Sequence, residues 1–322
     1  MSLLSQKHLQ DEQAAYDWVE AHVWPDGPVC PKCGSVERIS KMAGKATRFG
    51  LYKCYACRSQ FRVTVGTIFE ASHIPLRLWL QAMYLIAGSK KGISSNQIHR
   101  TLGLTLKSAW FMSHRIREAM RSGSLAPMGS TGGVVEVDET IYGRASTHPK
   151  GRRRKNAKIT NSAHRNVILS LVERGGQVRS YHVEGSTVGQ IIPIVTANIS
   201  HEAQVMTDSA QLYKYRMGKF ASHDRVDHSK EEYVRYELGR VVIHTNTVEN
   251  VFSVFKRGMR GVYQHCSEKH LHRYLAEFDF RYNNRMALGV NDEQRAAAIV
   301  KGIVGKRLTY RTVGGAGPEA RS

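Results

Sequence analysis

Apolar residues recur at helical spacing in the first third of the chain. In residues 1–20, positions such as Leu9 and Trp18 are partly periodic, which predicts an amphipathic helix. The stretch PLRLWLQAMYLIAG, which begins at Pro75 and ends at Gly88, predicts a second and more apolar helix. This part of the chain is therefore expected to be mainly helical.

The next stretch, ISSNQIHRTLGLTLKSAWFMSHRIREAM, predicts two helices joined by a tight turn. Ser94 or Ser95 would cap the first helix, Gly103 marks the turn, and Thr105 would begin the second helix. In a helix-turn-helix module the second helix enters the major groove of DNA, and Lys107 and Arg115 would be exposed there. A plain helical hairpin between two modules is the alternative.

The pattern changes to strands after residue 133. SGSLAPMGSTGG, at residues 122–133, has the composition of a linker. The elements expected beyond it are a strand at 134–140, a hairpin of Asn166–Glu173 and Gln177–Val183, a helix at Thr187–Ile199, a strand at Gln204–Met206, and a strand at Val241–Ile243 before a long helix. This order predicts an α/β domain, a mixed sheet flanked by helices.

Three carboxylates stand near the ends of these elements. Asp138 lies in the first strand or at its end, Asp208 follows the fourth, and Glu249 lies in the first turn of the long helix, which Asn246 or Thr247 would cap. Each acid alone has an ordinary structural explanation, as a turn cap or as a favourable charge at a helix start. Together, in a basic chain, they indicate a site for divalent metal, because Mg²⁺ prefers carboxylate oxygens and serves phosphodiester chemistry.

Lys256 follows Glu249 by seven residues, two helical turns, so both side chains project from one face of the helix. Lys256 and Arg257 could contact DNA phosphates beside the site, or could simply be solvated. Glu139 beside Asp138, and Asn250 beside Glu249, leave the identity of the ligands open. His228 and His244 could approach the metals, but structural hydrogen bonding is the expectation for each.

The strong excess of basic residues indicates what kind of molecule the protein binds. There are 47 Lys and Arg against 27 Asp and Glu, a formal net charge of +20. Such an excess predicts a polyanionic partner, most simply DNA. An anionic membrane is the rival, but the sequence shows no long apolar run, signal peptide or lipidation motif, so a soluble, cytoplasmic protein without a membrane partner is expected.

Four of the five cysteines form two CxxC pairs, Cys30 with Cys33 and Cys54 with Cys57. Four thiolates at this separation can close tetrahedrally on one structural Zn²⁺, with hairpin-like sequence between them. Redox-active or metal-free thiols are the alternatives. The fifth, Cys266, is expected to be a spectator.

Between residues 144 and 165 there are eight Lys or Arg and no acid, including Arg152, Arg153 and Arg154. This composition is typical of a flexible arm that neutralises DNA phosphates and orders on binding. A loop that is merely solvated has the same composition.

At this point the chain resembles a known family. VDETIYG, VMTDSAQLY, HTNTVENVFSVFKRGMRGVY and KHLHRYLAEFDFRYNNR are similar to motifs of bacterial insertion-sequence transposases that carry an N-terminal zinc ribbon, and CPKCG and CRSQFRVTVGTIFE match that ribbon. Asp138, Asp208 and Glu249, with Lys256, resemble the DDE(K) signature of the retroviral-integrase-like superfamily. The resemblance covers about residues 20 to 300. YGRA after Asp138 departs from the glycine pair of the family.

The resemblance implies an RNase H-like catalytic domain in which Asp138, Asp208 and Glu249 hold Mg²⁺ or Mn²⁺. Water would cleave the element ends, and the freed 3′ hydroxyl would attack target DNA. A homo-oligomer on DNA, associated with the nucleoid, is expected because two ends must meet. The rival functions are an inert DNA-binding regulator derived from a transposase and an RNase H-like nuclease that never joins strands.

The predicted domains are as follows: an N-terminal helix and zinc ribbon at 1–72, the helix-turn-helix module at 73–121, a linker at 122–133, the catalytic domain at 134–300, and a tail at 301–322.

Overall fold

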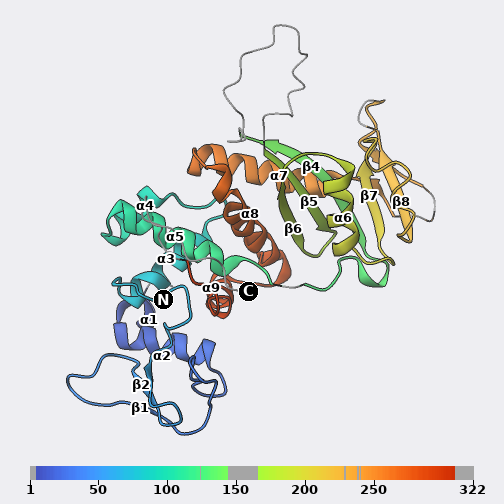
Figure 1. Ribbon diagram of the computed structural model, residues 1–322. Helices are drawn as coiled ribbons and strands as arrows, with labels where there is room; N and C mark the ends of the chain where they lie inside the picture. Colours follow the sequence, from blue (N-terminus) through green and yellow to red (C-terminus); the bar gives the residue numbers. More distant parts are fainter. Residues whose placement is uncertain are drawn as a thin grey trace, which may run out of the picture. The chain divides into compact units, whose positions relative to one another are not determined.

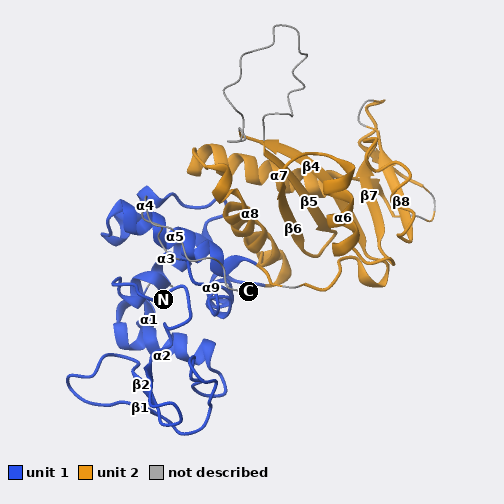
Figure 2. Cartoon of the chain, viewed as in Figure 1, with its two compact units in different colours: residues 1–121, 290–322 blue, residues 122–289 orange. Residues whose placement is uncertain are grey.

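The computed structural model describes residues 5–123, 125–143, 166–227, 230–237, 239 and 241–308. The chain forms two compact units, coloured separately in Figure 2: Met1–Arg121 together with Val290–Ser322, and Ser122–Gly289. No helix in the described ranges is long and apolar enough to cross a bilayer.

The first unit combines a small three-stranded sheet with helices (Figure 1). Its elements are α1 (Lys7–Gln10), α2 (Glu12–Val23), β1 (Ile39–Lys41), β2 (Tyr52–Cys54), β3 (Gln60–Phe61), α3 (Leu76–Gly88), α4 (Ser95–Leu102), α5 (Leu106–Met120) and α9 (Asp292–Lys301). The antiparallel order β1-β2-β3 gives the ribbon, whose small core includes Tyr52 and Phe61.

The helix pair of α4 and α5 is confirmed with its predicted signals. The Ser94 side chain accepts a hydrogen bond from the Gln97 backbone N–H, and Gly103 ends α4 with a φ of 66°. Thr105 caps α5 by accepting from the Ser108 backbone N–H. A left-handed φ favours glycine because an L side chain clashes with the backbone there, so the turn residue has a steric reason.

The second unit is built on a mixed five-stranded sheet. Its elements are β4 (Val134–Tyr142), β5 (Asn166–Glu173), β6 (Val178–Val183), α6 (Val188–Asn198), β7 (Gln204–Asp208), β8 (Ser222–Val226), β9 (Val234–Arg235), β10 (Ile243–His244), α7 (Asn246–Gly258), a π-helical turn (Met259–Tyr263), α8 (Glu268–Asn283), and 3₁₀ turns at Ser130–Gly132 and Met286–Leu288. The strand order is β6-β5-β4-β7-β8. The first three strands are antiparallel, and β7 runs parallel to both β4 and β8.

The expected fifth strand was assigned to the wrong segment. The apolar run Val241–Ile243 contributes only to β10, two residues that pair with β9 in a separate two-stranded sheet. The fifth strand of the main sheet is β8, SHDRV, at the sheet edge. Its sequence gave no signal, because an edge strand can carry polar side chains along most of its length.

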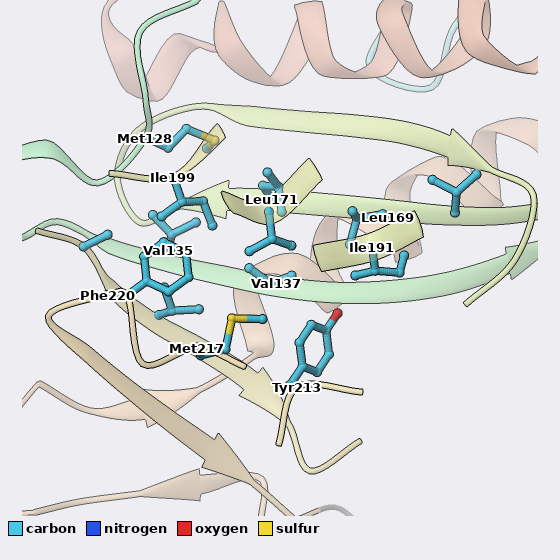
Figure 3. Close-up of a cluster of buried hydrophobic side chains, with 14 of the residues drawn as sticks. Met128, Val135, Val137, Leu169, Leu171, Ile191, Ile199, Tyr213, Met217 and Phe220 are labelled. Atoms are coloured by element: carbon cyan, nitrogen blue, oxygen red, sulfur yellow. The ribbon is translucent and has the colours of Figure 1, made fainter. Parts of the chain in front are cut away.

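Helices cover both faces of the main sheet. On one face α6 packs its Ile191 and Val195 against Val137 and Leu169 in the core drawn in Figure 3. On the other face α7 and α8 pack against Ile168, Val172 and Val178, and α7 contributes Val248, Val251, Phe252 and Phe255 to that core. Strand alternation separates the two cores, since successive β5 side chains point to opposite faces. The resulting mixed sheet between helical layers is an RNase H-like architecture.

The compact unit that holds the sheet ends at Gly289, whereas the sequence prediction extended the catalytic domain to residue 300. α9 instead belongs to the first unit, where it packs mainly against α3. The Arg295 guanidinium donates to the Ala87 carbonyl at 3.1 Å, and Ile299 and Val300 are fully buried. Sequence pattern gives the apolar face of such a helix but not its distant partner.

Candidate active site

Two of the predicted acids lie on neighbouring parallel strands. Val137 of β4 is in register with Thr207 of β7. The next residue on each strand, Asp138 and Asp208, therefore lies at the same level of the sheet. Asp138 lies within β4, which continues to Tyr142, and Asp208 is the last residue of β7. Parallel pairing therefore brings two carboxylates together that are far apart in sequence.

Glu249 joins them from α7, across a pocket of about 490 Å³. The pocket is lined by Asp138, Thr140, Asp208, Glu249, Phe252, Ser253, Lys256, Arg257 and Arg260. All of these residues belong to the second unit. The pocket thus combines the three acids with basic side chains of α7 and of the π-helical turn.

The acids repel one another. Burial raises the pKa of Asp138 to about 8, and the negative charge of Asp208 adds to the rise. Glu249 acts in the same direction, while a hydrogen bond of 2.7 Å from the Glu139 backbone N–H to Asp138 Oδ1 opposes it. Burial and the neighbouring acids therefore make the ionised form of Asp138 unfavourable, and a bound cation would stabilise that form.

The donor set fits hard divalent cations, which take carboxylate oxygens. The three acids are spread more widely than ligands of one small ion: in the described part of the chain, a group whose ligand atoms all lie within 4.8 Å of one another is formed by the four cysteines and not by these acids. Two ions about 3.5–4 Å apart would need a wider set of ligands than one.

Strand alternation separates Asp138 from Glu139. Asp138 faces the pocket, whereas Glu139 points to the opposite face of β4 and accepts a short hydrogen bond from the Tyr213 hydroxyl. Burial raises the pKa of Glu139 to about 7, although the Tyr213 hydrogen bond opposes this. The neighbour Asn250 is exposed and is not among the residues that line the pocket. The geometry therefore favours Asp138 and Glu249 over their neighbours.

Basic side chains follow Glu249 along one face of the helix. Lys256 is partly buried, Arg257 is exposed, and both line the pocket as predicted. Burial lowers the pKa of Lys256, and the nearby charge of Arg260 lowers it further, while Asp138 raises it. Arg260 was missed in the sequence, although its position four residues after Lys256 is a helical repeat.

The cysteines form a second candidate metal site in the first unit. The Sγ atoms of Cys30 and Cys57 are 3.7 Å apart, as are those of Cys33 and Cys54. All four lie within 4.8 Å of one another, as tetrahedral ligands of one Zn²⁺ must. Cys266 is in the other unit and packs beside the core of α7 and α8.

The two predicted DNA-contacting residues of α5 differ. Lys107 is exposed, but Arg115 is only 5% exposed. The Arg115 guanidinium donates to the backbone carbonyls of Glu70 at 2.9 Å and Leu308 at 3.0 Å, and lies 5.0 Å from the ring of Phe111. Arg115 therefore cannot also reach DNA in this structure. The helical pattern alone did not show that this basic residue lies on the packed face.

Arg152, Arg153 and Arg154, with the whole segment 144–165, lie outside the described residues, as does His228. His244 does not line the pocket. Its Nδ1 atom lies 3.2 Å from the buried carboxylate of Glu136, so it takes part in a polar network next to the site.

Two protein-family models match this chain, one over the zinc ribbon and one over the domain with the main sheet. Residues 130–283 match the model of the ISXO2-like transposase domain, and residues 10–60 match that of the transposase zinc-ribbon domain. A protein of Halobacterium salinarum, described as an uncharacterised protein in transposable element ISH50, is 28% identical over 286 residues, which cover 85% of this chain and 92% of the relative. The two domain matches together span more than half of the sequence, and the RNase H-like sheet and the four-cysteine cluster lie within them. The chain therefore belongs to the insertion-sequence transposases that combine a zinc ribbon with an ISXO2-like transposase domain.

Proposed function

We propose that this protein is a DNA transposase that cleaves the ends of its element and joins them to target DNA, with Asp138, Asp208 and Glu249 as the catalytic carboxylates. The observation that carries the proposal is the pocket that brings these three acids together beside Lys256, Arg257 and Arg260. Few other functions require three acids to converge in a protein with a formal net charge of +20.

The carboxylates would hold Mg²⁺ or Mn²⁺. The chemistry that such ions supply when bound is activation of the attacking oxygen and stabilisation of the leaving oxygen. Lys256 and Arg257 would bind phosphates that flank the scissile bond and so place it over the acids. Arg260 extends this basic surface and would do the same for a phosphate further along the strand.

The first unit would bind DNA and not cleave it. A Zn²⁺ held by Cys30, Cys33, Cys54 and Cys57 would leave no open coordination position, so its role would be structural. Lys107 at the exposed start of α5 remains a proposed phosphate contact. Two DNA ends must meet for transposition, so a homo-oligomer on DNA, in the cytoplasm and at the nucleoid, is the assembly that this function implies.

A strand-transfer assay tests the function. Zinc-loaded protein is incubated with labelled DNA that carries the ends flanking this gene, a target plasmid, and Mg²⁺ or Mn²⁺. Asp208→Ala should abolish cleavage and joining but retain DNA binding. Glu184→Ala is the matched control, because Glu184 is an exposed acid of the same unit outside the pocket.

The outcomes also separate the rival functions. DNA binding without metal-dependent chemistry in the wild-type protein would identify a regulator and refute the proposal. Cleavage without joining would identify a nuclease. Equal activity of Asp208→Ala and wild type would remove the carboxylates from the mechanism.

A further inference from the structure

A fourth acid, Glu136, does not line the pocket and has no place in the proposed chemistry. It is on β4 two residues before Asp138, so both side chains point to the same face of the sheet. Unlike Asp138, Glu136 is completely buried. A buried carboxylate is costly unless its oxygens are fully hydrogen-bonded, so its partners indicate what it does.

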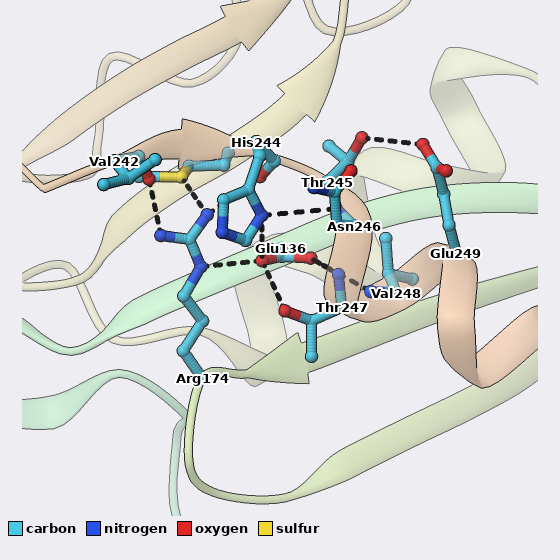
Figure 4. A network of polar contacts seen from close by, with 10 residues as sticks. Glu136, Arg174, Val242, His244, Thr245, Asn246, Thr247, Val248 and Glu249 are labelled. Carbon is cyan, nitrogen blue, oxygen red and sulfur yellow. Dashed lines mark hydrogen bonds and ion pairs between the residues drawn. The ribbon is translucent and has the colours of Figure 1, made fainter. Parts of the chain in front are cut away.

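Glu136 caps the helix that carries Glu249. Its Oε2 atom accepts from the backbone N–H groups of Thr247 at 2.8 Å and Val248 at 2.9 Å, and its Oε1 atom accepts from the Thr247 hydroxyl at 2.8 Å (Figure 4). The N–H groups of a first helical turn have no partner within the helix, and a side chain just before the helix usually satisfies them. Here the expected caps, Asn246 and Thr247, lie inside α7, and a strand residue more than a hundred positions earlier takes that role.

Arg174 ties the same carboxylate to the segment that leads into α7. Its Nε atom donates to Glu136 Oε1 at 2.6 Å, its Nη1 to the Val242 carbonyl at 2.6 Å, and its Nη2 to the His244 carbonyl at 2.9 Å (Figure 4). The ion pair compensates the buried charge of Glu136. The two side chains together therefore fix the backbone from Val242 to Val248 against β4 near its start.

In the described ranges, no strand pairing joins this segment to the main sheet, although Ile243 packs against Met206 of β7 and Val226 of β8. β10 precedes α7 but is two residues long and pairs with β9, not with β4 or β7. Apolar packing of Val251 and Phe255 fixes the body of α7 on the sheet. Val248 of the first turn belongs to the same core, but apolar contacts are not directional, whereas the hydrogen bonds to Glu136 fix the direction of the first N–H groups.

We propose that Glu136 is a positioning residue: by capping the first turn of α7 from β4, it sets Glu249 at the distance from Asp138 at which the two can share bound metal. Glu249 follows Val248 directly, and its carboxylate accepts a bond of 3.2 Å from the Thr245 hydroxyl, so the capped turn also orients this side chain. The inference rests on the proposed metal site. It adds a residue that touches neither metal nor DNA.

The test is Mn²⁺ binding by the full-length, zinc-loaded protein, measured by calorimetry, with Glu136→Gln. Glutamine keeps the size of the side chain but removes its charge and replaces one acceptor with a donor. We expect the dissociation constant for Mn²⁺ to rise about 10-fold or more, the usual effect of losing a group that orients a metal ligand. Zinc content and binding of element-end DNA should stay as in the wild type.

Asp279→Asn is the matched control. Asp279 ties α8 to β6, an edge strand of the same sheet, since it accepts from the Ser180 backbone N–H and hydroxyl, both at 2.7 Å. Both Glu136→Gln and Asp279→Asn remove a hydrogen-bonded carboxylate and should lower the melting temperature, but Asp279→Asn should leave the Mn²⁺ affinity unchanged. Thr247→Val, which removes a single bond to Glu136, is the milder variant and should raise the Mn²⁺ dissociation constant less.

A double variant separates positioning from general loosening. In a Glu249→Gln background the ligand is already lost, so Glu136→Gln should weaken Mn²⁺ binding little further. The inference is overturned if Glu136→Gln weakens Mn²⁺ binding as much in the Glu249→Gln background as in the wild type. It is also overturned if Glu136→Gln binds Mn²⁺ with wild-type affinity while Asp208→Ala loses binding. Either result leaves the proposed metal site intact. If Asp208→Ala binds Mn²⁺ as the wild type does, the proposed site itself fails, and the inference fails with it.

Discussion

The charge of Asp138 should destabilise the folded protein when no cation is bound. Its pKa is raised from 3.8 to about 8, chiefly by burial and then by Asp208. Between these two pH values the folded state keeps a proton that the unfolded state has lost, so the free energy of unfolding falls as pH rises. Asp138→Asn removes this titration and should make the cation-free protein more stable at pH 8.

The structure sets the size of the effect. A shift of about four pH units corresponds to about 6 kcal/mol at about 1.4 kcal/mol per unit, which is an upper bound because relaxation and water screen the neighbouring charges. A third of this, about 2 kcal/mol, would raise the melting temperature by about 4–8 °C in a unit of this size. At pH 5 most of the difference should disappear, because the folded wild-type carboxyl is then protonated.

Thermal unfolding of the zinc-loaded protein, in buffer without added Mg²⁺ or Mn²⁺, measures this. Wild type and Asp138→Asn are compared at pH 5 and pH 8, and then with Mg²⁺ added. Mg²⁺ should stabilise the wild type only, while the variant should lack cleavage activity. A variant that melts below the wild type at pH 8, or that gains equally at both pH values, would refute the reasoning.

Three further results are expected. Cys54→Ser should lose zinc and weaken DNA binding, because a structural zinc site contributes folding energy directly, while Cys266→Ser should keep a full zinc content by elemental analysis. Phe255→Ala should lower the free energy of unfolding by about 3–5 kcal/mol in urea titrations, because this ring is buried between the sheet and α8; a loss below about 1 kcal/mol would contradict the packing. Lys256→Ala should weaken DNA binding equally for all sequences and reduce the slope of log affinity against log salt by about 1, and an unchanged slope would exclude a phosphate contact.

Local signals in the sequence were sufficient for much of the fold. The cap of α4 at Ser94, the left-handed Gly103 and the hairpin around Gly175 and Gly176 each depend on contacts within a few residues. Such contacts are encoded where they occur, so position and residue type predict them. β8 was not predicted because a polar edge strand has no local sequence pattern that distinguishes it from a loop.

Several residues that line the pocket were predictable from the sequence, but the contacts that hold α7 in place beside it were not. Asp138, Asp208 and Glu249 stood out because acids at these element ends resemble a known signature, and the structure brings them to one pocket. Glu136 has the same parity on β4 as Asp138, which places both on one face. Nothing in the sequence pairs it with the first turn of α7.

The sequence by itself determined many of the local elements, the two CxxC pairs and the basic charge, because each depends on residue type and short spacing, and its resemblance to a known signature singled out the three acids as candidates. Tertiary structure decided which strand completes the sheet, that α9 joins the first unit, that Arg115 is buried, and that Glu136 caps α7. These outcomes depend on contacts between residues that are distant in sequence. Their energies come from burial and hydrogen bonding that exist only once the chain has folded.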